Sequence, residues 1–235
     1  MIVEGSIAVK AVIHGNKREV DKVYIRKDKK TKDFNYIRKL CKSKNIQIEE
    51  LDSEKIEEFA SGKSHGGILA EVNNRKYDEF DNGDIFFLDG IEDPFNLGYA
   101  MRTLFALGIK NVLLSTRDYS TMAAQLLKSS AGAYEMLNIK IAEDALNQIK
   151  EYKDNGYYVY GLYRGDNSKD IFEVDFNKKA LFILGGEKRG ISSELLKECD
   201  EHLYISYGSE FRNSLNACAA VDVVATLLYS QRKND

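Results

Sequence analysis

The sequence predicts an α/β protein in which a small N-terminal α/β domain precedes a larger domain built on a parallel sheet. Apolar runs typical of buried strands alternate with segments of helical spacing along the chain. A polar stretch at 73–84 interrupts this alternation, and 235 residues suit one large domain or two modest ones. We therefore expect a domain at 1–75, a linker at 76–84 and a second domain at 85–235.

In the first domain, apolar spacing and capping residues define six elements. Asp33 and Asp52 are the expected N-caps of the second and third helices, and Gly62 is the expected end of the third. The expected helices are 6–15, 33–45 and 53–62, and the expected strands are 20–26, 46–50 and 68–72.

In the second domain, strands and helices alternate more strongly. The expected strands are 85–90, 111–115, 136–142, 157–163, 180–186 and 202–206. The expected helices are 96–108, 121–133, 145–156, 192–200 and 214–232. Strands and helices alternating at this spacing indicate a parallel sheet covered on both faces.

Composition excludes several classes of protein. Hydrophobic residues make up 43% of the chain, which is too many for a disordered chain. No run approaches the roughly 20 apolar residues of a membrane helix, and the N-terminus lacks the pattern of a secretory signal. Three dispersed cysteines and three dispersed histidines form neither a disulfide framework nor a metal-ligand pattern. We expect a cytoplasmic protein with reduced thiols and without a metal or a membrane anchor.

The net charge of −3 is unevenly distributed. Residues 17–44 contain 12 Lys and Arg but only four acids, and 26–32 reads Arg-Lys-Asp-Lys-Lys-Thr-Lys. Such a cluster is expected where a protein binds a phosphate backbone, although a solvated helix face with a charged loop has the same composition. The candidate RNA-binding residues are Lys27, Lys29, Lys30 and Lys32.

Three segments that follow strands carry residues that a simple connection would not need. Ligands of parallel α/β sheets bind beyond the carboxyl ends of the strands. In the first segment, 89–102, Asp-Pro forms a turn and Asn96 suits an N-cap. Arg102 follows on an apolar helix, where a cation near the N-terminal end is disfavoured by the helix dipole. It indicates a nearby anion or partner group, although an arginine extending outward has the same pattern.

The second segment is a glycine turn, Gly185-Gly186-Glu187-Lys188-Arg189-Gly190. Paired glycines let the backbone approach a ligand closely, but neither common phosphate-binding fingerprint is present. The third segment runs from 208 to 220, where Ser214 and Asn216 open an apolar, alanine-rich helix. Ser214 on its own also suits a helix N-cap.

Together these segments resemble the SpoU family of RNA ribose 2′-O-methyltransferases, in the SPOUT superfamily. The family's first motif is an Asn six residues before an Arg, which matches Asn96 and Arg102. Its second motif is a Gly-x-Glu-x-x-Gly turn, which matches 185–190. Its third motif is Ser-Leu-Asn opening the last helix, which matches 214–216. Ser129-Ser130-Ala131-Gly132-Ala133 is close to a further family stretch. Residues 1–75 more weakly resemble the ribosomal-protein-like RNA-binding domain of many members, through the α/β order and the turn at 65–67.

The resemblance implies a C-terminal trefoil knot, a homodimer and methyl transfer from S-adenosylmethionine to a ribose 2′-hydroxyl of structured RNA, with rRNA favoured over tRNA. The implied cofactor-binding residues are Leu184, Gly185, Gly186, Ile205, Ser214 and Leu215. The implied catalytic group comprises Arg102, Asn96, Glu187, Ser214 and Asn216. The family arginine is proposed as the base, but a guanidinium is not ordinarily deprotonated. We therefore expect Arg102 to bind phosphate and stabilise the developing alkoxide, with the proton acceptor left open.

The chain departs from the family pattern in three places. Phe95 stands where His or Gln is common, and 205–208 reads Ile-Ser-Tyr-Gly where the family usually has Ile-Pro-Met-x-Gly. After Asn216 the chain reads Ala-Cys-Ala instead of Val-Ser. A catalytically silent RNA-binding protein of the same fold is the alternative; a dehydrogenase is disfavoured because its fingerprint is missing.

Overall fold

The computed structural model describes residues 1–176 and 178–233, which form two compact units. The first contains Met1–Lys76 together with Tyr119–Met136. The second contains Tyr77–Asp118 and the chain from Leu137 onward. Residues 119–136, which the sequence groups with the C-terminal domain, thus pack within the first unit. None of the described helices is long and apolar enough to cross a membrane.

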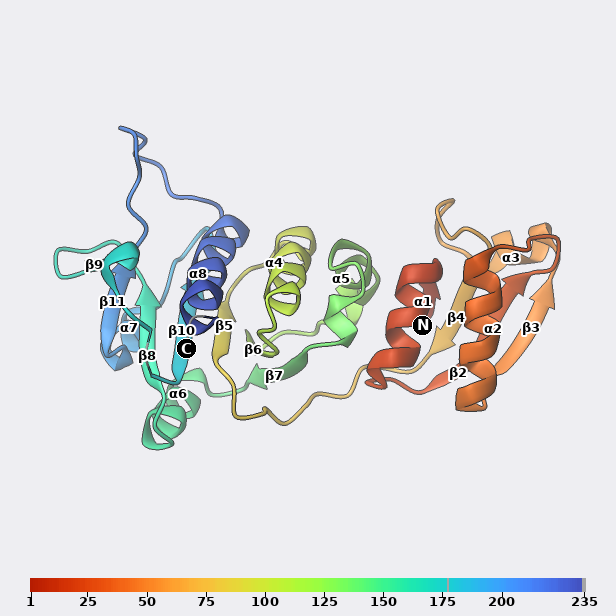
Figure 1. Cartoon of the computed structure of the whole chain (residues 1–235), viewed down its shortest axis with the longest axis horizontal. Coiled ribbons are helices and arrows are strands. Elements are labelled where there is room, and N and C mark those ends of the chain that lie inside the picture. Colours follow the sequence, from red (N-terminus) through yellow and green to blue (C-terminus); the bar gives the residue numbers. More distant parts are fainter. Residues whose placement is uncertain (177, 234–235) are drawn as a thin grey trace. The chain divides into compact units, whose positions relative to one another are not determined.

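The first unit contains a four-stranded mixed sheet (Figure 1). Its strands, in the spatial order β1-β4-β2-β3, are β1 (Ile2–Glu4), β4 (Ile68–Val72), β2 (Val20–Arg26) and β3 (Gln47–Leu51). Its main helices are α1 (Ser6–Gly15), α2 (Lys32–Lys44) and α3 (Ser53–Phe59). Strands β2 and β3 are parallel, and the other two pairs are antiparallel. The sequence did not predict β1, because three residues are too few to show a period.

One expected helix start and one expected helix end in this unit differ from the structure. Thr31, and not Asp33, is the N-cap of α2, because its hydroxyl accepts a hydrogen bond from the Phe34 amide. Asp33 lies in the first turn and pairs with Lys10 instead. Asp52 does hold the N-cap position of α3 but makes no capping hydrogen bond. The helix α3 ends at Phe59, before the expected stop at Gly62.

The segment 119–136 contains η1 (Ser120–Met122), α5 (Ala123–Ser129) and η2 (Ala133–Glu135). The prediction of one helix over 121–133 is wrong, because Ala131 and Gly132 adopt positive φ angles of 50° and 88°. The Ser130 hydroxyl accepts a hydrogen bond from the Tyr134 amide across this break. Gly132 also permits a close approach to α1, since a Cβ there would lie 2.5 Å from the Cβ of Ala11.

A buried ion pair ties this segment to the start of β2. Arg18 Nε donates to Glu135 Oε1 at 2.8 Å, and the two side chains are 1% and 0% exposed. Arg18 Nη1 also donates to the Asn73 carbonyl at 3.2 Å. Neither Arg18 Nη2 nor Glu135 Oε2 has a hydrogen-bond partner in the described structure. Gly15 is required beside this pair, because a Cβ there would lie 2.1 Å from the Glu135 carbonyl oxygen.

The second unit contains a seven-stranded sheet in which every neighbouring pair is parallel, which confirms the predicted sheet. In the spatial order β7-β6-β5-β10-β8-β11-β9, the strands are β7 (Asn138–Ala142), β6 (Asn111–Ser115), β5 (Ile85–Asp89), β10 (Ala180–Gly185), β8 (Tyr158–Leu162), β11 (Glu201–Tyr204) and β9 (Lys169–Asp170). The two-residue β9 and the short turn η3 (Ile171–Glu173) were not predicted.

Helices cover both faces of this sheet (Figure 1). They are α4 (Pro94–Ala106), α6 (Ala145–Asp154), α7 (Ser193–Glu198) and α8 (Ala217–Arg232). Ile149 of α6 and Leu195 of α7 pack with Phe87 of β5 in one core cluster. Phe86 and Phe182 stack on the opposite face, where α8 packs against both α4 and β10.

Two helix starts in this unit also correct the sequence prediction. Asp93 caps α4 by accepting from the Phe95 and Asn96 amides, so Asn96 is not the N-cap. Asn216 caps α8 by accepting from the Ala219 amide at 2.7 Å, so the helix begins at Ala217 and not at 214. In both cases another side chain reaches the free amides of the first turn.

The strand order determines where a ligand site forms. Strand β10 pairs with β5 on one side and with β8 on the other, although β6 and β7 intervene between β5 and β8 in the sequence. The strand order therefore reverses beside β5, and crevices form beyond the carboxyl ends of strands at such a point.

Candidate active site

A cavity of about 310 Å³ lies beyond the carboxyl ends of β8, β10 and β11. This volume is at the lower end of the range for small-molecule sites. Its walls include every residue that the family resemblance assigns to the cofactor: Leu184, Gly185, Gly186, Ile205, Ser214 and Leu215. The structure thus brings together residues from two loops that are separated by about twenty residues of sequence.

The glycine turn at 185–190 forms one wall of the cavity. The Gly190 amide donates to the Gly186 carbonyl at 2.9 Å, and Gly190 adopts a positive φ of 62°. A Cβ on Gly185 would lie 2.2 Å from the Gly190 carbonyl carbon, and one on Gly186 would lie 2.1 Å from the Gly90 carbonyl oxygen. Glycine is therefore required at 185 and 186, because other backbone segments approach both positions closely.

The first two motifs meet directly. Asn96 Nδ2 donates to Glu187 Oε1 at 2.8 Å, across 91 residues of sequence. Since Asp93 caps α4, the side-chain amide of Asn96 is available for the contact with Glu187. Lys188 and Glu92 form a second link at 3.0 Å, and the hydrogen bond from Lys188 lowers the pKa of Glu92. These two contacts hold the loop after β5 and the turn after β10 together beyond the carboxyl ends of the strands.

Arg102 lies on the exposed side of α4, whose buried side includes Leu97, Met101 and Leu104. Within residues 1–176 and 178–233, no hydrogen bond or ion pair joins Arg102 to Asn96 or to Glu187. Phe95 and Tyr99, at helical spacing before Arg102, are also about half exposed. Arg102 thus lies on the same exposed face of α4 as two aromatic residues.

Ser214 and Asn216 have different roles in the structure. Asn216 uses its side-chain oxygen to cap α8, so it orders the loop. Ser214 is exposed and lines the cavity. The alternative that Ser214 is the N-cap is wrong, because Asn216 holds that position.

Sequence reasoning missed further residues of this cavity, including two arginines. Tyr204, Tyr207, Arg164 and Arg212 also line it. Tyr207 lies in the loop that departs from the family pattern. This departure was the only feature of the sequence that could have pointed to these residues. The contact between Arg164 and the tyrosines depends on tertiary folding that no local period reveals.

With this geometry, similarity to known proteins identifies the family. A model described as the SpoU rRNA Methylase family matches residues 84–226, more than half of the chain. The chain belongs to the SpoU methylase family. A second model, described as RNA 2′-O ribose methyltransferase substrate binding, matches residues 2–78.

Relatives of the SpoU family match the chain from end to end. A Staphylococcus saprophyticus protein named for the TrmH family of tRNA/rRNA methyltransferases is 29% identical over 99% of this chain and 96% of its own length. A Staphylococcus aureus protein of the same name is 28% identical over 98% and 96%.

Solved structures of RNA methyltransferases share the fold. A TrmH-family RNA methyltransferase from Porphyromonas gingivalis has a TM-score of 0.81 at 21% identity, over 99% of this chain and 89% of that one. The SpoU methyltransferase AviRb from Streptomyces viridochromogenes, solved in complex with AdoMet, has a TM-score of 0.79 at 17% identity, over 99% and 90%.

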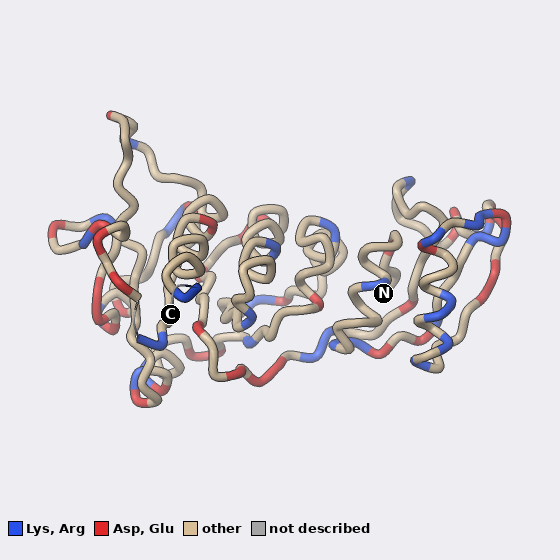
Figure 2. The backbone as a smooth tube through the Cα atoms, viewed as in Figure 1, with Lys and Arg blue, Asp and Glu red and all other residues tan. Residues whose placement is uncertain are grey.

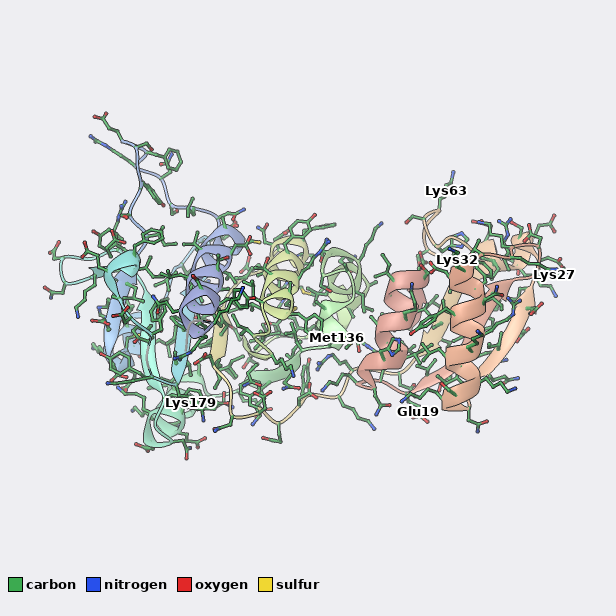
Figure 3. The ribbon with its side chains drawn as sticks, viewed as in Figure 1. Glu19, Lys27, Lys32, Lys63, Met136 and Lys179 are labelled. Carbon is green, nitrogen blue, oxygen red and sulfur yellow. The ribbon has the colours of Figure 1, made fainter. Side chains whose placement is uncertain are left out.

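The basic cluster of this SpoU protein lies at the β2–α2 turn, where acidic residues lie beside it (Figure 2). Lys27 pairs with Asp52 at 2.6 Å, and Lys29 donates to the Gly66 carbonyl at 3.2 Å. Lys30 and Lys32 are exposed, and no ion pair joins either of them to the described part of the chain. The side chains of Lys27 and Lys32 are marked in Figure 3. The side chains of two of the four predicted RNA-binding lysines therefore have neither an ion pair nor a hydrogen bond within the described part of the chain.

The cysteines do not take part in this site. Burial raises the pKa of Cys41 and Cys218 to about 11 and that of Cys199 to about 12. All three are free thiols, and they stay protonated at neutral pH. Among the described residues, no group of three or more His, Cys, Asp or Glu side chains is arranged to hold a metal ion.

Proposed function

We propose that this SpoU family member transfers a methyl group from S-adenosylmethionine to a ribose 2′-hydroxyl of structured RNA, with rRNA favoured over tRNA. The observation that carries the proposal is the cavity beyond β8, β10 and β11, which is lined by all six expected cofactor residues. The substrate-binding model that matches residues 2–78 supports the ribose hydroxyl as the acceptor.

The residues of the cavity fit this cofactor. The apolar walls at Leu184, Ile205 and Leu215 suit an adenine ring, and the turn beside them can be formed only with glycine at 185 and 186. These residues, with Ser214, would hold S-adenosylmethionine. When bound, it supplies an electrophilic methyl group.

Methyl transfer to a ribose requires that the hydroxyl be oriented and its developing charge be stabilised. We assign the second task to Arg102, which also contacts an RNA phosphate beside the target nucleotide. Asn96 and Glu187, already hydrogen-bonded to each other, orient the ribose and Arg102. Ser214 positions the nucleotide, and Asn216 fixes the loop that carries it. The proton acceptors that this arrangement allows are Arg102 and water.

The wider organisation follows from the same proposal. Residues 1–75 would bind RNA, 76–84 would be a linker, and 85–235 would carry catalysis. The insertion of β10 between β5 and β8 supports a trefoil knot in the C-terminal part. We also propose a homodimer in which the long apolar α8 helps to bury the interface. Action on rRNA or tRNA would suit a protein of the cytoplasm.

The proposed reaction predicts a specific product. Incubation with labelled S-adenosylmethionine and bulk rRNA or tRNA should place label on 2′-O-methylnucleosides, identified by mass spectrometry after complete digestion. Label on a base would contradict the proposal. Cofactor binding without any product in either RNA would favour the catalytically silent alternative.

A matched pair of glycine variants tests the location of the cofactor in the same experiment. Gly185→Ala should weaken S-adenosylmethionine binding in calorimetry by more than tenfold, because the added Cβ meets the Gly190 backbone. Gly208→Ala is the control, since a Cβ there meets no atom within 4 Å. Equal affinity in both variants, with thermal unfolding unchanged, would show that the cofactor binds elsewhere.

The divided lysine cluster predicts unequal contributions to RNA binding. Lys30→Gln with Lys32→Gln should raise the KM for RNA more than Lys27→Gln with Lys29→Gln, because the latter pair already contacts Asp52 and Gly66. The two double variants lose the same charge. The logarithmic salt dependence of binding should fall by up to about 0.9 per lost phosphate contact, and kcat at saturating RNA should be preserved. Unchanged RNA binding in both double variants would show that the β2–α2 turn does not bind RNA.

A further inference from the structure

Arg164, on the loop after β8, is held in place by two tyrosine rings. Its guanidinium carbon lies 5.6 Å from the ring centroid of Tyr204 and 5.0 Å from that of Tyr207. The Tyr207 hydroxyl accepts a hydrogen bond from the Leu215 amide at 3.1 Å, which ties the start of this loop to its end. Cation–π contact with two rings restricts a side chain that otherwise has many rotamers. The guanidinium is therefore preorganised at the wall of the cavity.

The guanidinium of Arg164 can bind an anion. Glu187 is the only acid among the residues that line the cavity, and it already accepts a hydrogen bond from Asn96. In the described part of the chain, no carboxylate pairs with Arg164. By contrast, Arg232 of the same unit is paired with Asp84. A guanidinium has five donors in a planar fork, which match a carboxylate through two parallel hydrogen bonds.

We propose that Arg164 binds the α-carboxylate of S-adenosylmethionine and that Tyr207 positions Arg164 for this contact. This inference rests on the proposed function, because it places that cofactor in this cavity. The carboxylate is the cofactor's one anionic group. A cavity of about 310 Å³ matches a small molecule, which favours the cofactor over an RNA phosphate as the anion. Tyr207 stands in the loop where the sequence departs from the family pattern.

Calorimetry with two ligands tests the contact. S-adenosylhomocysteine carries the carboxylate, whereas 5′-methylthioadenosine lacks the amino-acid end. Arg164→Gln should weaken binding of S-adenosylhomocysteine by roughly tenfold or more, since a hydrogen-bonded charge pair is lost, and should leave the affinity for 5′-methylthioadenosine unchanged. Arg164→Lys should recover part of the loss. Tyr207→Leu should show the same selectivity, and Tyr207→Phe, which keeps the ring, a smaller effect.

Lys178→Gln is the matched control. Lys178 also lies over a tyrosine ring, that of Tyr158 at 4.3 Å, but outside this cavity. It should change neither affinity. Equal weakening of both ligands by Arg164→Gln would overturn the inference, because the residue would then support the cavity as a whole. Unchanged affinity for both ligands, with a higher KM for RNA, would overturn it in favour of phosphate. If the unaltered protein bound neither ligand, the proposed function itself would fail.

Discussion

Arg102→Ala is expected to lower kcat by about 10²–10³-fold at saturating RNA and saturating cofactor. Arg102 is assigned to the charge that develops on the ribose oxygen, and a preorganised charge of this kind acts mainly in the transition state. The cofactor cavity is formed by other loops, so the Kd for S-adenosylmethionine should stay within about twofold of its original value. Single-turnover kinetics with 2′-O-methyl readout and calorimetry would measure the two quantities.

Because of the position of Arg102, its replacement by alanine should not disturb the fold. Its side chain is exposed on α4, and alanine is the best helix former, so the substitution leaves neither a cavity nor a broken helix. Arg102→Lys is the discriminating control, because it keeps the charge and loses the planar fork. Near-normal turnover of Arg102→Ala would mean that Arg102 takes no part in catalysis. Loss of cofactor binding would mean that it lies in the wrong subsite.

Glu135→Gln is expected to destabilise the first unit by about 3–5 kcal/mol, because it leaves the Arg18 charge buried without a counter-ion. The chain has no tryptophan, so hydrogen exchange at the β2 and β4 amides is a suitable measure of local stability. The double variant Arg18→Met with Glu135→Met should lose less than either single variant, because it leaves no charge behind.

A surface pair in the same unit supplies the control for this prediction. Arg38 and Glu50 pair at 2.6 Å with side chains that are 31% and 50% exposed. Glu50→Gln should have a much smaller effect on exchange at the same amides, since water screens the remaining charge. If Glu135→Gln and Glu50→Gln had similar effects, the buried pair would not stabilise the unit in the way argued here.

Local patterns predicted much of the structure. The alternation of apolar runs and helical spacing located six of the seven parallel strands, since each of those strands is four or more residues long. The motif spacing of Asn96 and Glu187 anticipated two residues that do meet in the fold. Patterns were less reliable at helix ends, where Asp93 and Asn216 took the capping positions from Asn96 and Ser214.

The remaining features depend on contacts between distant parts of the chain. The pairing of β1 with β4, the stacking of Arg164 on Tyr207 and the burial of Glu135 leave no local period. The positive φ at Ala131 was also not predictable, because alanine ordinarily favours the helix that is broken there.

The burial of Glu135 in the first unit has a consequence for the order of events on the ribosome. Its partner Arg18 is synthesised 117 residues earlier, which at 5–20 residues per second is roughly 6–23 s. During that interval the N-terminal residues have emerged, but the only carboxylate paired with Arg18 in the described structure does not yet exist. The N-terminal unit therefore reaches its final packing only after translation has passed residue 136, when β5 and β6 have also been made. Completion of the first unit is thus timed by the synthesis of part of the second.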